Sequence, residues 1–335
     1  MTDDRIPFPI ALAALAAAGE ETRLRILALL AEAELTVSEL VAILGQSQPR
    51  VSRHLKLLVE GGLAQRRREG AWAFFRLAQA GSSADLARSV IARLDPTDGQ
   101  LAADQARLGD IRRQRTEHAA RYFAAHAPFW DRVRALHAPE ALVERAVLEV
   151  TGAHAMGRVL DCGTGAGRMI ELLARQAEQV IGVDLSPAML AVARANLERA
   201  GVRNALLRQG DIYALPVAAN SCDLAIVHQV LHYLDDPARA LREAARALVP
   251  GGRLLIVDFA PHDQEFLREA HAHRRLGFSS TEIEDLVDAC GLDIIKHRHL
   301  SPPHDQSGKL TVSIWLAQDR RIQTDVAPPR ATEFA

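Results

Sequence analysis

One glycine-rich stretch, residues 159–167, constrains what this chain can fold into more than any other. It reads Val-Leu-Asp-Cys-Gly-Thr-Gly-Ala-Gly, an apolar run that ends in an acid and continues with three glycines at alternate positions. Glycine has no Cβ and adopts positive φ, so such a turn lets backbone amides approach a ligand where a strand leads into a helix. In a dinucleotide fingerprint the third glycine would stand at Arg168. The spacing therefore predicts a nucleotide-type ligand that is not a dinucleotide.

Apolar runs continue at regular intervals after the glycines, and two more of them end in an acid. The second run ends at Asp184 and the third at Asp211, followed by runs over residues 222–227 and 253–257. Parallel strands that are buried on both faces appear as continuous apolar runs of this kind. Helices are expected to start at Pro187 and Pro237 between these runs. The pattern predicts an α/β fold with a doubly wound, Rossmann-like sheet, completed by an antiparallel strand over residues 310–316.

These ordered motifs resemble the class I S-adenosylmethionine (SAM) dependent methyltransferases, of the type 11 or UbiE-like group, from about Ala124 to Asp319. The resemblance implies that the glycine turn lies under the methionine part of SAM, and that S-adenosylhomocysteine is the product. It also implies that Asp184 holds the ribose hydroxyls, since a carboxylate accepts two hydrogen bonds at once. Leu185 would cover the adenine, and Asp211 with the Ile212 amide would meet its polar edge. The implied cofactor-binding residues are Asp161, Gly163, Gly165, Gly167, Asp184, Leu185, Asp211, Ile212 and His228.

The segment after the fourth strand, residues 228–236, borders the transferred methyl group in this family. Methyl transfer from a sulfonium mainly requires alignment, together with a base where the acceptor is protonated. The candidates for positioning the acceptor or taking its proton are His228, His232 and Tyr233. The alternative is that His232 and Tyr233 only pack against a helix. A small molecule is the expected acceptor, and the sequence does not identify it.

The first third of the chain predicts a helix-turn-helix followed by a β-hairpin. Residues 21–30 have helical apolar spacing, residues 36–45 begin with a hydroxyl cap and end at glycine, and residues 47–58 form a helix capped by Ser47. Residues 63–77 read as a hairpin that turns at Glu69-Gly70. This arrangement places a polar helix face in a major groove. The candidate DNA-contacting residues are Gln48, Arg50, Ser52, Arg53, His54, Lys56, Arg66, Arg67 and Arg68.

Local charge supports this interpretation. Between Gln48 and Arg76 seven arginines and lysines stand against two acids, Glu60 and Glu69, which gives +5 in a chain of net charge −2. Local positive charge attracts the phosphates of double-stranded DNA, whatever the charge of the whole chain. The alternative is an ordinary solvated basic face.

The same residues resemble the ArsR family of winged-helix regulators from about Ile10 to Arg93. The resemblance implies a homodimer on a pseudo-palindromic operator, with residues 11–15 and 86–94 at the interface. Many members sense metal through cysteines in a stretch that here reads Glu-Leu-Thr-Val-Ser, residues 34–38, and the helix after the wing has Asp85 but no histidine. Because hydroxyls cannot build a soft thiolate site, no metal site is expected.

Breaks in the pattern suggest the domain organisation. We expect an ArsR-like domain over residues 1–95, a helical linker and cap over 96–150, a methyltransferase domain over 151–319 and a disordered tail over 320–335. Residues 95–99 are a hinge candidate. Aromatic residues after the linker helix are candidates for a lid over SAM or for packing anchors: Tyr122, Phe129 and Trp130.

Cysteine usage and apolar length point to a cytoplasmic protein that does not span a membrane. Cys162, Cys222 and Cys290 are far apart in sequence and cannot all pair, which indicates a reducing compartment. The arsenic-methylating relatives rely on a cysteine trio, which is not expected here. The apolar stretch from Ile10 to Ala18 is too short to cross a bilayer.

Three functions fit these observations. In the first, an ArsR-type DNA-binding regulator carries a methyltransferase domain that methylates a small molecule. In the second, the methyltransferase fold is a sensor that binds SAM or S-adenosylhomocysteine without turnover. In the third, the chain is an enzyme with a vestigial DNA-binding module, which specific and steeply salt-dependent operator binding would exclude.

Overall fold

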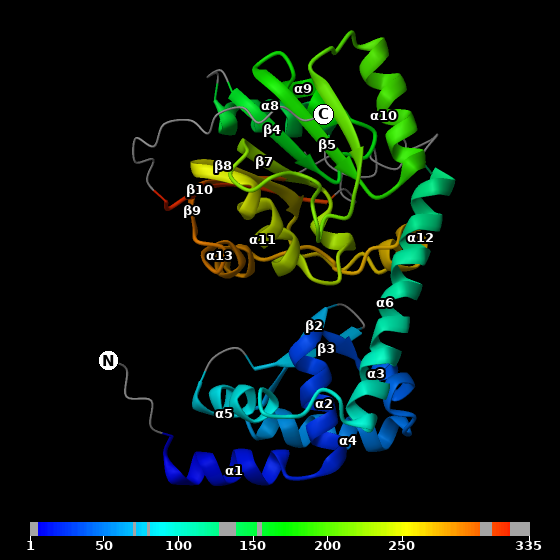
Figure 1. Ribbon diagram of the computed structural model, residues 1–335, viewed down its shortest axis with the longest axis vertical. Helices are drawn as coiled ribbons and strands as arrows, with labels where there is room; N and C mark the ends of the chain where they lie inside the picture. The colour runs from blue at the N-terminus through cyan, green and yellow to red at the C-terminus, as the bar shows by residue number, and fades with distance from the viewer. Residues whose placement is uncertain are drawn as a thin grey trace. The chain divides into compact units, whose positions relative to one another are not determined.

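The computed structural model describes residues 6–69, 72–78, 81–126, 139–152, 156–301 and 310–321. These residues fall into two compact units (Figure 1). Unit 1 is Met1–Ala119 together with Asp263–Ala272, and unit 2 is Ala120–His262 together with His273–Ala335. Each unit encloses a hydrophobic core of its own. The lid candidates Phe129 and Trp130, the side chain of Tyr122 and most of the expected tail lie outside the described residues.

Unit 1 has the winged-helix arrangement that the sequence predicts. Its wing is an antiparallel hairpin in which Ala64 pairs with Leu77 and Glu69 with Trp72, and β1 pairs with the other edge of β3. The turn residues Gly70 and Ala71 lie outside the described residues. The elements are α1 (Phe8–Ala18), α2 (Glu21–Glu32), β1 (Leu35–Thr36), α3 (Val37–Leu44), α4 (Gln48–Glu60), β2 (Ala64–Glu69), β3 (Trp72–Leu77), α5 (Ser82–Ile91) and α6 (Gly99–His126).

Local signals set the ends of α3 and the start of α4. The Glu39 amide donates to Thr36 Oγ1 at 3.3 Å and the Thr36 amide donates to the Glu39 carboxylate at 2.9 Å, a reciprocal capping box. Gly45 ends α3 with φ +65, a left-handed conformation that favours glycine. Ser47 stands at the N-cap of α4 as expected, but its side chain makes no capping hydrogen bond in the described part of the chain.

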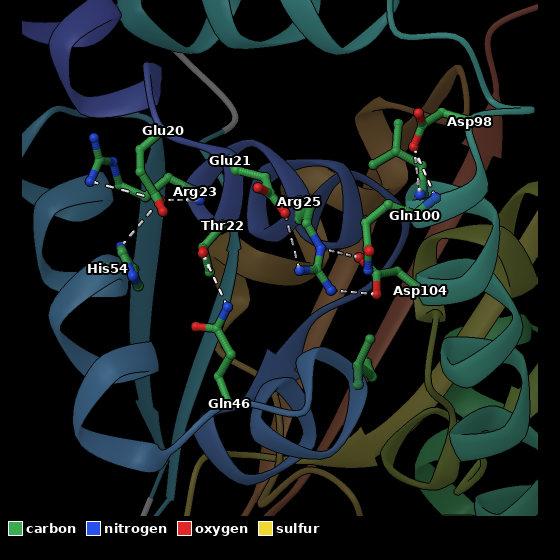
Figure 2. A network of polar contacts seen from close by, with 12 residues as sticks. Glu20, Glu21, Thr22, Arg23, Arg25, Gln46, His54, Asp98, Gln100 and Asp104 are labelled. Carbon is green, nitrogen blue, oxygen red and sulfur yellow. Dashed lines mark hydrogen bonds and ion pairs between the residues drawn. The ribbon is translucent and has the colours of Figure 1, made fainter.

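The first half of α6 packs on the core of unit 1. Arg25 of α2 donates from Nε to Asp104 Oδ2 at 2.7 Å and from Nη2 to Asp104 Oδ1 at 2.9 Å (Figure 2). Leu108 is fully buried in the same core, and Arg107 Nη1 donates to the Ile43 carbonyl at 3.0 Å. The expected hinge is a turn capped by Asp98, whose Oδ1 accepts from the amides at the start of α6. The helix after that turn is therefore part of unit 1 up to Ala119 and continues into unit 2.

Unit 2 is a mostly parallel sheet between helical layers. Its strand order in the described residues is β6-β5-β4-β7-β8-β10-β9, with β10 antiparallel to both of its neighbours. Helices α8, α9 and α10 lie on one face of the sheet, and α11 and α13 lie on the other (Figure 1). The doubly wound arrangement and the closing antiparallel strand confirm the sequence prediction. This order brings the carboxyl ends of β4, β5, β6, β7 and β8 to one edge.

The elements of this part of the chain are α8 (Glu140–Thr151), β4 (Met156–Cys162), α9 (Arg168–Leu173), β5 (Ala177–Asp184), α10 (Pro187–Arg199), β6 (Ala205–Gln209), β7 (Cys222–His228), the 3₁₀ helix η2 (Leu231–Tyr233), α11 (Pro237–Ala247), β8 (Leu248–Phe259), α12 (Phe266–His271), α13 (Ser280–Asp288), β9 (Leu292–Leu300) and β10 (Val312–Asp319). Of these, α12 is counted with unit 1. Across the described ranges, no helix combines the length and the apolar character that crossing a membrane requires.

Replacing Asp104 with alanine should strongly lower the stability of the packing of α6 on unit 1. The side chains of Arg25 and Asp104 are only 9% and 2% exposed, so the substitution leaves a buried guanidinium without its carboxylate. Removing one partner of a buried ion pair costs about 3–5 kcal/mol. Hydrogen exchange of peptides from α2 and from the first half of α6 should show a loss of protection of that order.

The matched control is Asp110→Ala on the same helix, where the carboxylate is exposed and pairs with Arg113. An exposed ion pair contributes less than about 1 kcal/mol, so this variant should exchange nearly like the native protein. Equal exchange in the two variants would show that the buried pair does not hold α6 on unit 1.

Candidate functional site

The glycine turn connects β4 to α9, and its glycines adopt positive φ angles that other residues rarely adopt. Gly163, Gly165 and Gly167 have φ of +78, +53 and +83. A Cβ on Gly163 would lie 2.6 Å from Val230 Cγ2, and a Cβ on Gly167 would lie 3.2 Å from the Cβ of Ala193. The turn is therefore packed closely against its neighbours, and its three glycines leave the backbone without side chains at these positions.

Asp184, at the end of β5, fastens the glycine turn to the next strand. Its Oδ2 accepts from the Gly165 amide and its Oδ1 accepts from the Ser186 amide, each at 2.8 Å. Burial raises the pKa of this carboxyl. Each carboxylate oxygen has a second lone pair, so Asp184 retains acceptor capacity for hydroxyls. The neighbouring Leu185 exposes its apolar side chain beside it.

Asp161, near the end of β4, is a buried acid, and one of its two carboxylate oxygens accepts no hydrogen bond from the described residues. Thr164 Oγ1 donates to its Oδ2 at 2.6 Å, while Oδ1 is buried and has no hydrogen-bond partner among the described residues. Burial raises the pKa of Asp161 to about 7. An acid of this kind suits a ligand group that carries donors or positive charge.

The other cofactor candidates lie along the same edge. The Gly210 amide donates to the Asp184 carbonyl at 3.0 Å, which brings the end of β6 next to the end of β5. Asp211 is exposed and its Oδ1 accepts from the Tyr213 amide at 2.9 Å, and Ile212 is half-buried. The structure therefore gathers the glycine turn, Asp161, Asp184 and Asp211 at neighbouring strand ends.

The segment after β7 turns sharply and returns to the glycine turn. His228 is the half-buried last residue of β7, and Gln229 has φ +53, which a non-glycine residue rarely adopts. Val230 then packs on Gly163. His232 is buried, and its Nδ1 lies 2.8 Å from Oδ1 of Asp258, the penultimate residue of β8. The sequence predictions missed Asp258, although it closes an apolar run just as Asp161 and Asp184 do.

Unit 1 presents a polar surface along α4 and the wing. Val51, Leu55 and Leu58 of α4 are buried in the core, which turns the opposite side of the helix toward solvent. Seven of the DNA-contact candidates have exposed side chains there or on β2: Gln48, Arg50, Ser52, Arg53, Lys56, Arg66 and Arg68. Arg66 and Arg68 share one face of β2 because side chains alternate along a strand.

His54 and Arg67 lie elsewhere. The His54 side chain is 11% exposed and its Nδ1 lies 3.5 Å from Glu20 Oε2 (Figure 2). Burial lowers the pKa of His54, although the Glu20 carboxylate opposes this. Arg67 donates from Nε and Nη2 to the Glu34 carboxylate at 3.0 and 3.1 Å, and its guanidinium lies 5.1 Å from the centre of the Phe74 ring. Both side chains support the fold of unit 1, so they do not belong to the exposed face.

Among the described residues, the cysteines and the histidines of β9 are not arranged as a metal site. Asp161 pairs with Ile226 across β4 and β7, so Cys162 lies about five residues, or roughly 16 Å, further along the sheet than Cys222. His299 Nδ1 is 2.8 Å from Ser313 Oγ, and the ring of His297 stacks on Trp315. In the part of the chain that is described, no three His, Cys, Asp or Glu side chains gather to hold a metal.

Known protein families match a segment of each unit. The family described as "Bacterial regulatory protein, arsR family" matches residues 20–66, and the family described as "Methyltransferase domain" matches residues 160–256. The uncharacterized methyltransferase YcgJ of Bacillus subtilis is 37% identical over 107 residues, which is 32% of this chain and 42% of that protein. The arsenite methyltransferase of Halobacterium salinarum is 30% identical over 168 residues, which is 48% of this chain and 42% of that protein.

The match therefore spans less than half the length of these two relatives. A chain in the solved complex between the Haloferax volcanii Trm112 methyltransferase activator and the putative methyltransferase is 20% identical with a TM-score of 0.50. It covers 61% of this chain and 100% of that chain, which supports the fold.

Asp161→Asn should change how stability depends on pH. The ordinary pKa of the carboxyl is 3.8 and burial raises it to about 7. Between these values the unfolded chain has released the proton that the native protein retains, so this group lowers native stability by about 1.4 kcal/mol for each unit that the pH rises. From pH 5 to pH 7 the free energy of unfolding of the variant, relative to the native protein, should rise by about 2 kcal/mol.

Urea unfolding followed by circular dichroism at pH 5, 6 and 7 measures this difference. Asp263→Asn, at an exposed position, should run parallel to the native protein at all three values. A constant difference between Asp161→Asn and the native protein would mean that Asp161 does not hold its proton in the folded state.

Proposed function

Because the chain joins an arsR-family helix-turn-helix segment to a methyltransferase domain, we propose that it is a DNA-binding regulator that uses SAM to methylate a small molecule. The observation that carries this proposal is the glycine turn between two acids, Asp161 and Asp184, each of which has acceptor capacity left for a ligand. Asp161 Oδ1 lacks a partner among the described residues, and Asp184 holds the turn while keeping free lone pairs.

The residues at this edge fit SAM group by group. SAM supplies a methyl group on a positively charged sulfur. The backbone of Gly163, Gly165 and Gly167 would support its methionine part, close to the acceptor oxygen of Asp161. Asp184 would accept from the ribose hydroxyls and Leu185 would lie on the adenine face. Asp211, the Ile212 amide and His228 would complete the site.

The exposed polar surface of α4 and the wing would bind the DNA operator. Gln48, Arg50, Ser52, Arg53 and Lys56 would meet the major groove and its phosphates, and Arg66 and Arg68 would meet the backbone beside it. Helix α1 exposes Phe8, Leu12 and Leu15. Apolar side chains in solvent favour burial against another surface, which supports a homodimer through α1 and α5.

A second candidate function is a sensor without turnover. It has the same SAM site, and operator binding would report SAM or S-adenosylhomocysteine. The observation in its favour is that the His232 side chain is only 1% exposed, so an acceptor reaches this base candidate only if neighbouring residues move. The two functions separate by product: an enzyme converts SAM to S-adenosylhomocysteine with some acceptor, while a sensor changes operator affinity and forms no product.

Asp184→Asn should weaken binding of both SAM and S-adenosylhomocysteine by about 10-fold to 100-fold. The amide side chain accepts on only one of its two terminal atoms, so hydrogen bonds to a charged group worth about 1.5–3 kcal/mol are lost. Isothermal titration calorimetry measures the affinities. Asp293→Asn, at an exposed position of β9, is the matched control and should bind both ligands like the native protein. Unchanged affinity in Asp184→Asn would remove this carboxylate from the ligand site.

Arg53→Ala and Arg66→Ala should each weaken binding to a duplex from the promoter of the protein's own gene. Each lost phosphate contact should lower the slope of log affinity against log salt by about 1. Fluorescence anisotropy at several salt concentrations measures this slope. Arg93→Ala removes the same charge from an exposed position outside α4 and the wing and should leave the slope unchanged. A common effect of all three changes would indicate general charge attraction without a defined surface.

A further inference from the structure

A buried pair of His232 and Asp258 lies at the carboxyl edge of the sheet in unit 2. His232 Nδ1 is 2.8 Å from Asp258 Oδ1, and the two side chains are 1% and 0% exposed. The Phe259 amide donates to the same Asp258 oxygen at 2.8 Å. A carboxylate in this place holds the imidazole proton on Nδ1 and leaves the lone pair of Nε2 as the basic site.

Each end of the pair carries a polar atom whose hydrogen-bonding capacity is unused. His232 Nε2 and Asp258 Oδ2 are both buried, and neither has a hydrogen-bond partner in the described portion of the chain. Leaving a buried polar atom in this condition costs about 1–3 kcal/mol. The pair is therefore poorly suited to stabilise the fold, and it leaves the Nε2 nitrogen of His232 available for a hydrogen bond with a ligand.

Aromatic rings surround the histidine. The centre of the His232 ring lies 4.1 Å from that of Tyr233, 4.2 Å from that of His273 and 4.8 Å from that of Phe259. Rings at these separations favour further flat aromatic groups through offset or edge contacts. The environment of the His232 ring thus suits an aromatic compound better than an aliphatic one.

The pair is also close to the proposed SAM site. Val230, two residues before His232, packs on Gly163 of the glycine turn.

A second segment of the chain contacts the backbone of His232. The amides of Arg274 and Arg275 donate to the His232 carbonyl at 2.9 and 3.1 Å. The adjoining segment, residues 273–276, lies between two left-handed positions, Ala272 at φ +56 and Gly277 at φ +88.

We propose that His232 is the base that takes the proton from the methyl acceptor, that Asp258 positions it, and that the acceptor is a small phenol. This inference rests on the proposed methyl transfer. The phenol O–H bond breaks and its proton goes to His232 Nε2, while the bond from that oxygen to the methyl carbon forms. The bond between sulfur and methyl breaks with its electron pair staying on sulfur, which leaves neutral S-adenosylhomocysteine. The adjoining segment 273–276 moves to admit the acceptor.

Proton transfer to His232 can be observed without turnover by using 4-nitrophenol, whose ionised form absorbs at longer wavelength than its protonated form. The full-length protein is first saturated with S-adenosylhomocysteine and then titrated with 4-nitrophenol at a pH at which the free probe is mostly protonated. The native protein should bind the probe and increase its phenolate absorbance. His232→Gln should bind the probe without that increase, and Asp258→Asn should reduce it.

Turnover gives a second readout in the same variants. With SAM present, methylation of unsubstituted phenol should fall by about 10²-fold to 10⁴-fold in His232→Gln, the usual contribution of a general base. His299→Gln in β9 is the matched histidine control and should behave like the native protein in both assays.

A phenolate signal that persists in His232→Gln overturns the inference, and so does a protein that binds S-adenosylhomocysteine but not 4-nitrophenol. A protein that binds neither SAM nor S-adenosylhomocysteine refutes the proposed function instead. Thermal melting establishes that each variant is folded. If His232→Gln does not fold, Asp258→Asn decides the question, because a merely structural pair would leave the phenolate signal of the bound probe unchanged.

Discussion

The hydrogen bond from the Gly165 amide to Asp184 Oδ2 is the interaction on which the carboxyl edge of the sheet in unit 2 depends. It holds a turn whose three glycines all have positive φ, next to the strand that follows in the sheet. Val230 can pack on Gly163 only because that residue has no Cβ. The position of η2, and with it that of His232, therefore follows from the shape of the glycine turn.

A second buried contact attaches the long helix α6 to the core of unit 1. The ion pair between Arg25 and Asp104 joins α2 to α6, a helix that runs without interruption from Gly99 to His126. Helix α6 begins in unit 1 and continues into unit 2, and the chain passes between the units again at Asp263 and after Ala272. An influence of a ligand on operator binding would be measured as a coupling free energy between two titrations.

Much of this arrangement could be predicted from the sequence, because the strongest signals are local. The glycine spacing, the acids that end apolar runs and the hydroxyl cap at Thr36 each act within a few residues. The contacts of Asp104 with Arg25 and of Asp258 with His232 join positions 79 and 26 residues apart, and no local pattern specifies such partners. Arg67 is an intermediate case: strand alternation already separates it from Arg66 and Arg68, but only the structure shows Glu34 beneath it.

The polar atoms buried without partners bear on the choice between an enzyme and a sensor. With the proposed SAM site, a sensor would need only the glycine turn, Asp161 and Asp184 to hold the ligand, and the proposed base would add nothing to it. Among the described residues, His232 and Asp258 each have a buried polar atom without a partner, so replacing both residues with apolar ones of similar shape would cost the fold little. The proposed proton transfer gives this pair a role that sensing alone does not give it, and that role would favour turnover.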